Sequence, residues 1–172
     1  ASFAIDPNTV DLDITTPLSI ENSFNTAEGQ FSVDASGVVT FTPVLNFFGE
    51  ATLSYTVQNT NPTPETSSPA LITVTVAAVN DIPSISSITD QTIDEDDQTG
   101  LLDFTVDDVE TDPGVLVVTA SSDNTALVPT SNIDIQGNGG SRTVQVTPLA
   151  NQFGVANITL TVEEGDDTNE TT

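Results

Sequence analysis

An internal repeat constrains the fold of this chain more than any other feature of its sequence. The stretch TPVLNFFG (residues 42–49) aligns without gaps on TPLANQFG (residues 147–154), 105 positions later. In the segment that follows, apolar residues occupy every second position of both copies: Ala51, Leu53, Tyr55 and Val57 in the first, and Ala156, Ile158, Leu160 and Val162 in the second. Two copies of one domain therefore follow each other, and 172 residues are enough for two domains that each bury a core of their own.

Apolar and polar residues also alternate along most of the remaining chain, with Thr and Ser at the polar positions. Such segments are Phe31–Val33, Val39–Phe41, Ile72–Val76, Leu102–Val106, Ile133–Ile135 and Val144–Val146. A period of two is typical of half-buried β-strands, and no segment shows a convincing helical period. The sequence predicts an all-β protein built from two tandem β-sandwiches stacked end to end.

The domain boundary is expected in AAVNDIP (residues 77–83), where one strand ends, another begins almost without a linker, and Pro83 stiffens the joint. The domains would then span residues 1–79 and 80–172. The first copy opens at about the third strand of the second, and the second ends without a counterpart of the strand Ala70–Val76. Either the borders of the fragment are arbitrary or neighbouring repeats supply the missing strands, and both alternatives imply a longer array.

The repeated turn also predicts the burial of particular aromatic residues. Phe48 aligns with Phe153, so we expect both to be buried beneath the turn, while Phe47 aligns with Gln152 and is free to be a surface contact, for example one that stacks on a sugar. Tyr55 and Leu160 are expected at equivalent inward positions.

Composition narrows the classes of function. The chain holds 26 Asp and Glu against one basic residue, Arg142, and its net charge of −25 repels nucleic acids and anionic membranes. Carboxylates without cationic partners favour divalent ions, and Ca²⁺ is the candidate because only hard oxygen ligands are present. Since the chain has no His, Cys or Lys, the usual bases for a nucleophile are absent, and the chain is not expected to be an enzyme.

Several motifs resemble the tandem cadherin-like and immunoglobulin-like repeats of large bacterial cell-surface adhesins. They are the junction VNDIP (79–83), the acidic loop DED (94–96), the turn DVET (108–111), NTALVP (124–129), the repeated turn 147–154 and the acidic turn after Val162. The resemblance implies two immunoglobulin-like sandwiches and an extracellular or cell-surface location. The family includes adhesins, stalks, filament proteins and modules attached to polysaccharide-degrading enzymes.

In a sandwich of this kind, the entering linker, the loop after the second strand and the loop before the last strand share one end. These segments carry the candidate calcium ligands Asn80, Asp81, Asp108, Glu110, Asp112, Glu164 and Asp166. A second candidate set, in the loop that would face the next repeat, is Asp94, Glu95 and Asp96. The alternative is that the acidic loops only keep a lysine-free protein soluble.

These observations predict a calcium-stiffened repeat module of a long extracellular surface protein, with a structural or adhesive role. The expected partners are the neighbouring repeats and, beyond them, surface glycans or another cell-surface protein, with neither nucleic acid nor membrane insertion. A carbohydrate-binding module and a metal-free passive spacer remain the alternatives.

Overall fold

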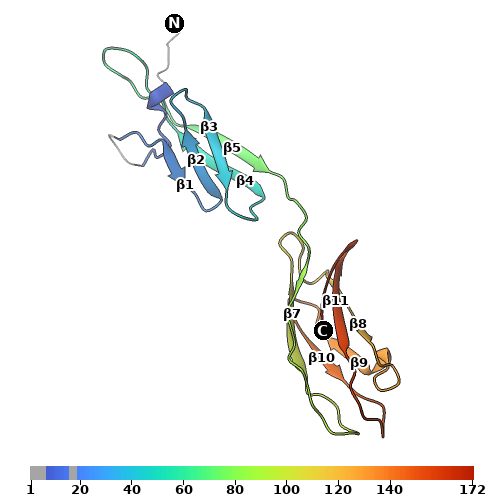
Figure 1. Cartoon of the computed structure of the whole chain (residues 1–172). Helices are drawn as coiled ribbons and strands as arrows, with labels where there is room; N and C mark the ends of the chain where they lie inside the picture. Colours follow the sequence, from blue (N-terminus) through green and yellow to red (C-terminus); the bar gives the residue numbers. More distant parts are fainter. Residues whose placement is uncertain (1–6, 16–18) are drawn as a thin grey trace. The chain divides into compact units, whose positions relative to one another are not determined.

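The computed structural model describes residues 7–15 and 19–172, which fall into two compact units, Ala1–Ala78 and Val79–Thr172 (Figure 1). Over the described residues, the only helical elements are the short 3-10 turns η1 (Pro7–Thr9) and η2 (Thr130–Asn132). No helix in this part of the chain is long and apolar enough to cross a membrane. The prediction of an all-β protein with tandem sandwiches is confirmed.

The first unit has two antiparallel layers. Strands β1 (Ser23–Asn25), β2 (Gly29–Val33) and β3 (Val39–Pro43) form one sheet, and β4 (Gly49–Tyr55) pairs with β5 (Ala70–Val76) in the other. The chain before β1 joins the second layer through a bridge between Asp11 and Thr56. The core consists of Val10, Leu12, Phe31, Ala51 and Leu53.

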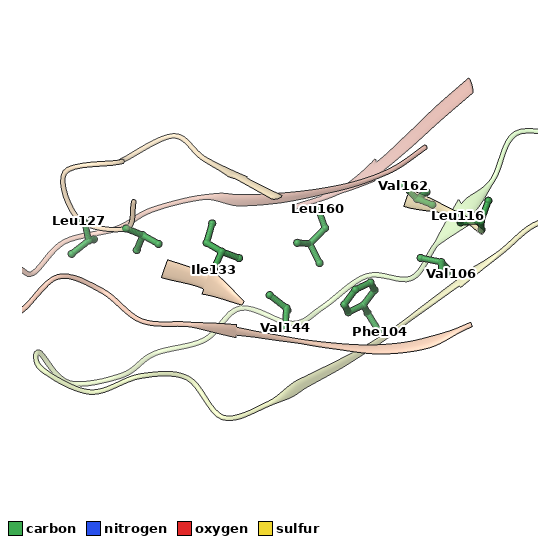
Figure 2. Packing of buried hydrophobic residues seen from close by; sticks show 9 residues of the cluster. Phe104, Val106, Leu116, Leu127, Ile133, Val144, Leu160 and Val162 are labelled. Atoms are coloured by element: carbon green, nitrogen blue, oxygen red, sulfur yellow. The ribbon is translucent and has the colours of Figure 1, made fainter. Parts of the chain in front are cut away.

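The second unit is a sandwich of two larger sheets. One sheet has the order β6 (Ser84–Ile85), β7 (Leu102–Asp107), β10 (Ser141–Val146) and β9 (Ile133–Gln136). The other has the order β12 (Asp167–Thr171), β11 (Ile158–Glu164) and β8 (Val117–Ser122). Figure 2 shows the core between them as a row of apolar side chains, with Leu127 at one end and Leu116 and Val162 at the other.

The internal repeat appears in the backbone as well as in the sequence. The asparagine of the repeated turn is left-handed in both copies, with φ of 61° at Asn46 and 58° at Asn151. The glycines that close the turn also have positive φ, 111° at Gly49 and 142° at Gly154. Asparagine and glycine are the residues that adopt this conformation at the least cost, which explains why the repeat holds them at these positions.

The strands after the turn keep the predicted register. Ala51 and Leu53 are buried in the first core, and Leu160 and Val162 are buried in the second. The remaining inward positions pack against the core of their own unit, namely Tyr55 and Val57 in the first and Ala156 and Ile158 in the second. The inward positions of the two copies therefore correspond, as the alternation predicted.

The prediction about the phenylalanines of the turn is wrong. Phe48 is 42% exposed and Phe153 is 87% exposed, so neither lies beneath the turn. Phe47, expected at the surface, packs against the first core, with its ring centroid 6.2 Å from that of Phe41. Which of two adjacent residues of the turn faces the core depends on local packing, and an alignment of sequences does not reveal that direction.

The end of the second unit differs from the expectation in one respect. Strand β12 was not expected, yet it pairs with β11 from Glu164 opposite Asp167 to Leu160 opposite Thr171. Its residues are polar and mostly exposed, so no apolar alternation marks it in the sequence. In the first unit Tyr55 lies opposite Ala70, and its repeat partner Leu160 lies opposite Thr171, so Thr171 is the equivalent of Ala70. Strand β12 therefore occupies the positions just before the equivalent of β5.

The described part of the first unit starts with a segment that corresponds to the third strand of the second unit, as expected. Asp11 lies opposite Thr56, as Thr119 of β8 lies opposite Thr161 of β11. The segment around Asp11 is thus the equivalent of β8, the third strand of the second unit. Within residues 7–15 and 19–78, nothing corresponds to β6 and β7.

The one basic side chain is part of the core of the second unit. Arg142 is only 7% exposed, and its guanidinium donates to the carbonyl oxygens of Gly139, Pro113 and Leu116 at 2.9, 2.8 and 2.8 Å. The fork of N–H donors in a guanidinium can satisfy several carbonyls at once. Arg142 thereby holds the loop before β8 and the hairpin loop before β10 together.

Candidate metal site

The loop after β7 is shaped by its first acidic residue. One carboxylate oxygen of Asp108, Oδ1, accepts the backbone N–H groups of Glu110 and Thr111 at 2.9 and 2.8 Å. Aspartate commonly closes a turn in this way. The turn leaves the side chain of Glu110 beside the segment that enters the second unit, where its Oε2 accepts the N–H of Asp81 at 3.0 Å.

The β11–β12 hairpin supplies the third group of acidic residues. Glu164 is the last residue of β11, and its Oε1 accepts the hydroxyl of Thr111. Asp167 opens β12, and its Oδ2 accepts the side-chain amide of Asn80 at 2.7 Å. The two-residue turn between them includes Gly165, which has a φ of 58°.

These hydrogen bonds link three segments at one end of the second unit. We call the linked residues the acidic network; they are Asn80, Asp81, Asp108, Glu110, Thr111, Glu164 and Asp167. Of the candidate ligands at this end, the structure brings together Asn80, Asp81, Asp108, Glu110 and Glu164.

The other candidates lie outside the acidic network. Asp112 is exposed and accepts the N–H of Gly114 at 2.7 Å. Asp166 is exposed in the turn, and the contact with Asn80 that we expected of Asp166 is made by its neighbour Asp167.

The second candidate set, Asp94, Glu95 and Asp96, lies in an exposed turn of its own. In this turn Asp96 has a φ of 68°, and its Oδ1 accepts the N–H of Asn151 at 2.7 Å. The loop therefore braces the repeated turn of the second unit, which is a structural role.

Two carboxylate oxygens in the acidic network are buried without a donor. They are Oδ2 of Asp108 and Oε2 of Glu164. A buried carboxylate oxygen without a hydrogen bond or a counter-charge is costly, and the one guanidinium of the chain donates to backbone carbonyls instead. These two oxygens are the places in the network where a cation would be stabilised.

The side chains do not form a finished coordination sphere. Among the described residues, no three acidic side chains lie close enough together to hold one metal ion. Glu110 and Asp167 instead use oxygens to accept N–H groups from the entering segment. A calcium ion at Asp108 and Glu164 would need further oxygens from these side chains.

Sequence reasoning missed two members of the network, Thr111 and Asp167. Gly165 followed by Asp166, between two segments that can pair as strands, is a signal for a tight hairpin, and it would have put Asp167 at the start of a strand. Thr111 directly follows the Asp-x-Glu turn, but nothing in the sequence shows that its hydroxyl reaches β11.

The comparisons with known proteins agree with the architecture. Residues 1–75 match the model of a family described as a bacterial Ig domain. The first unit is therefore similar to bacterial Ig domains. This match confirms the resemblance of the chain to bacterial immunoglobulin-like repeats, and the second unit repeats the register and turn of the first.

Other comparisons add little to this assignment. Among solved structures, a chimeric titin Z1Z2 functionalised with a KLER exogenous peptide from decorin is 14% identical, with a TM-score of 0.40 over 99% of this chain and 80% of the titin chain. No curated protein matches the chain.

Proposed function

We propose that this chain is a calcium-binding structural repeat module of a long extracellular surface protein. Two observations support an extracellular scaffold: the match of the first unit to a bacterial Ig domain and the repetition of its architecture in the second unit. The observation that carries the calcium part is the pair of buried, unpartnered oxygens on Asp108 and Glu164.

The chemistry of the acidic network fits calcium better than other metals. Calcium takes six to eight oxygen ligands at flexible distances, and the network offers carboxylates, an amide and the carbonyls of an irregular segment. Softer metals prefer nitrogen or sulfur ligands, and the chain has no His, Cys or Met. Asp108 and Glu164 would hold the ion, and Glu110 and Asp167 would complete the set through the second oxygen of each carboxylate, so that Oε2 and Oδ2 keep their bonds to the entering segment.

Binding there would restrain the segment that enters the second unit. Asn80 and Asp81 are the second and third residues of the second unit, and both are hydrogen-bonded to side chains that would bind the ion. A divalent ion also offsets part of a net charge of −25, which otherwise opposes the compact state. The proposed role of calcium is therefore to stiffen the entry of one repeat into the next.

The carbohydrate-binding alternative has little support in the structure. The aromatic residue expected to stack on a sugar, Phe47, packs against the first core instead. Phe48 and Phe153 are exposed, but they belong to different units, and a sugar platform needs neighbouring rings. Ig domains serve mainly as structural modules, which favours a scaffold over an enzyme.

Calorimetric titration with calcium tests the proposal directly. We expect binding with a dissociation constant of about 10⁻⁴ to 10⁻³ M, the range of extracellular modules. The variants Asp108→Asn and Glu164→Gln should each weaken binding at least about tenfold, because each removes charge from an oxygen that would hold the ion. The matched control, Glu95→Gln in the exposed loop, should bind as the parent does.

Amide hydrogen exchange identifies the structural effect. Calcium should slow exchange at Asn80 and Asp81 relative to a sample with chelator, while the cores of both units stay equally protected. The absence of both binding heat and protection would exclude calcium and leave a metal-free spacer.

A further inference from the structure

The hairpin loop between β9 and β10 holds the one Asn-Gly pair of the sequence, Asn138-Gly139. Asn138 is exposed and stands in a bend of the chain. Over the described ranges 7–15 and 19–172, neither the side-chain amide of Asn138 nor the N–H of Gly139 has a hydrogen-bond partner in the protein. Glycine also has no side chain to shield its backbone nitrogen. The amide carbon Cγ of Asn138 and the nitrogen of the next residue are therefore both open to reaction.

Other asparagines of the second unit lack this combination. The side-chain amide of Asn132 donates to the carbonyl of Thr147 at 2.9 Å, and that of Asn157 donates to Oδ2 of Asp123 at 2.7 Å. Each of these two asparagines is followed by an isoleucine, whose branched side chain crowds the backbone nitrogen. Reaction at these positions is opposed both by the hydrogen bond and by the neighbouring side chain.

We propose that Asn138 is a site of spontaneous deamidation, a covalent modification that needs only water. The backbone nitrogen of Gly139 loses its proton to hydroxide and attacks Cγ of Asn138. The new N–Cγ bond closes a succinimide ring, while the Cγ–Nδ2 bond breaks and Nδ2 takes a proton from water and leaves as ammonia. Water then opens the ring at either of its two carbonyl carbons. The products are aspartate and isoaspartate, and no atom changes its oxidation state.

The isoaspartate product changes the path of the backbone beside Arg142. Its chain runs through the side-chain carbons, so the backbone before Gly139 becomes longer by a carbon atom. The carbonyl of Gly139 accepts Nε of Arg142 at 2.9 Å, and the carbonyl of Gly140 accepts the N–H of Val106 at 2.9 Å. Displacing the loop weakens both bonds, and through Arg142 it also loosens the loop before β8, which the same guanidinium holds. The second unit therefore loosens as the modification accumulates.

Gly139 is a glycine of this loop that alanine can replace. A β-carbon at Gly139 would meet nothing within 4 Å, and the φ of Gly139 is not in the left-handed region. By contrast, Gly137 has a φ of 93°, and a β-carbon at Gly140 would lie 3.2 Å from the carbonyl oxygen of Val106. The variant Gly139→Ala should therefore fold as the parent does and differ from it in the access to the backbone nitrogen.

The test incubates the full chain and the variants Gly139→Ala and Asn138→Gln at mildly alkaline pH. In the parent, anion-exchange chromatography should show a product with an added negative charge, and peptide mapping with isoaspartate-specific methylation should place it at residue 138. Gly139→Ala should slow its formation at least about tenfold, because the methyl group crowds the attacking nitrogen. Asn138→Gln should slow it further, since glutamine would have to close a larger ring. The parent should react more slowly at neutral pH, where less hydroxide is present.

Amide hydrogen exchange separates the effect of the longer backbone from that of the added charge. The isoaspartate product, purified from the parent, should exchange the N–H of Val106 at least about threefold faster than the unmodified chain. Freshly prepared Asn138→Asp carries the same charge on a backbone of normal length. Its exchange at Val106 should therefore stay close to that of the parent.

Three outcomes would overturn the proposal. One is a parent chain that gains no charge at residue 138, and another is an equal rate of modification in the parent and in Gly139→Ala. The third is exchange at Val106 that does not distinguish the isoaspartate product from Asn138→Asp, which would show that the longer backbone does not loosen the loop. None of these measurements involves calcium, so a failure here leaves the proposed function untouched.

Discussion

The backbone N–H of Asp81 donates to Oε2 of Glu110 at 3.0 Å, so the segment entering the second unit is held by a side chain from the loop after β7. The acceptor is a carboxylate, and a carboxylate can also bind calcium. In the proposed site, Glu110 would accept this N–H with one oxygen and bind calcium with the other. The ion would then hold the entering segment through Glu110.

The variant Glu110→Gln separates these two partners. A glutamine oxygen can still accept the N–H of Asp81, so the thermal stability without calcium should change by less than about 0.5 kcal/mol. The stabilisation by added calcium should fall, because the amide oxygen carries no charge. Thermal unfolding with calcium and with chelator measures both quantities, with Glu95→Gln as the control. An unchanged calcium response would remove Glu110 from the ligand set.

Replacing the buried guanidinium should cost the second unit much of its stability. Arg142→Leu leaves the carbonyls of Gly139, Pro113 and Leu116 without their donor, and we expect a loss of about 3 kcal/mol in the free energy of unfolding. Urea unfolding measures the loss, and the exposed neighbour Ser141→Ala should stay within about 0.5 kcal/mol of the parent. Since the acceptors are carbonyls and not carboxylates, salt should change the difference little. A cost below that of the control would contradict this role.

The aromatic residues of the repeated turn should differ sharply in how much each contributes to the free energy of unfolding. Phe47→Ala removes a ring that packs on Phe41 and the first core, so it should destabilise the first unit by about 2 to 3 kcal/mol. Phe48→Ala, in the same turn, and Phe153→Ala, in the second unit, should each cost less than about 0.5 kcal/mol, because both rings are exposed. Urea midpoints of the three variants test this order. A larger loss for Phe153→Ala than for Phe47→Ala would reverse the assignment.

The β2–β3 hairpin turn should respond to acid through Asp34. The hydroxyl of Ser36 donates to Oδ1 of Asp34 at 2.6 Å and, with the N–H groups of Val38 and Ser36, holds the pKa of this carboxyl below its ordinary value. A lowered pKa stabilises the turn above the ordinary value of about 4, and the contribution disappears as the pH falls through the lowered value. Ser36→Ala should therefore raise the pKa of Asp34.

An NMR titration of the Asp34 carboxyl group measures this pKa. The control is Ser32→Ala on β2, which removes a hydroxyl that does not bond to Asp34 and should leave its pKa unchanged. An equal pKa of Asp34 in the parent and in Ser36→Ala would show that the hydroxyl does not set it.

Much of the fold could be predicted from the sequence, because the repeat and the alternation of apolar residues both report on the backbone. Leu53 and Leu160 face their cores as the period of two requires. The convergence of Asp108, Glu110 and Glu164 followed from the connectivity of a sandwich. Such features depend on chain direction and strand period, which a sequence carries explicitly.

Other features depend on local geometry that alternation does not encode. Phe47, and not Phe48, packs against the first core, although both follow the same left-handed asparagine. Strand β12 carries no apolar pattern, because its pairing with β11 needs only backbone groups. Which of Asp166 and Asp167 faces Asn80 is settled by a two-residue turn, and a shift of one position exchanges them.

The position of Arg142 also determines how the folded chain meets proteases. Enzymes of the trypsin type cut after lysine or arginine, and this chain offers them one such residue, which is 7% exposed and bonded to three carbonyls in the core. Cleavage there requires the second unit to open first. A single internal cation thus gives the chain resistance to a whole class of digestive enzymes for as long as it stays folded.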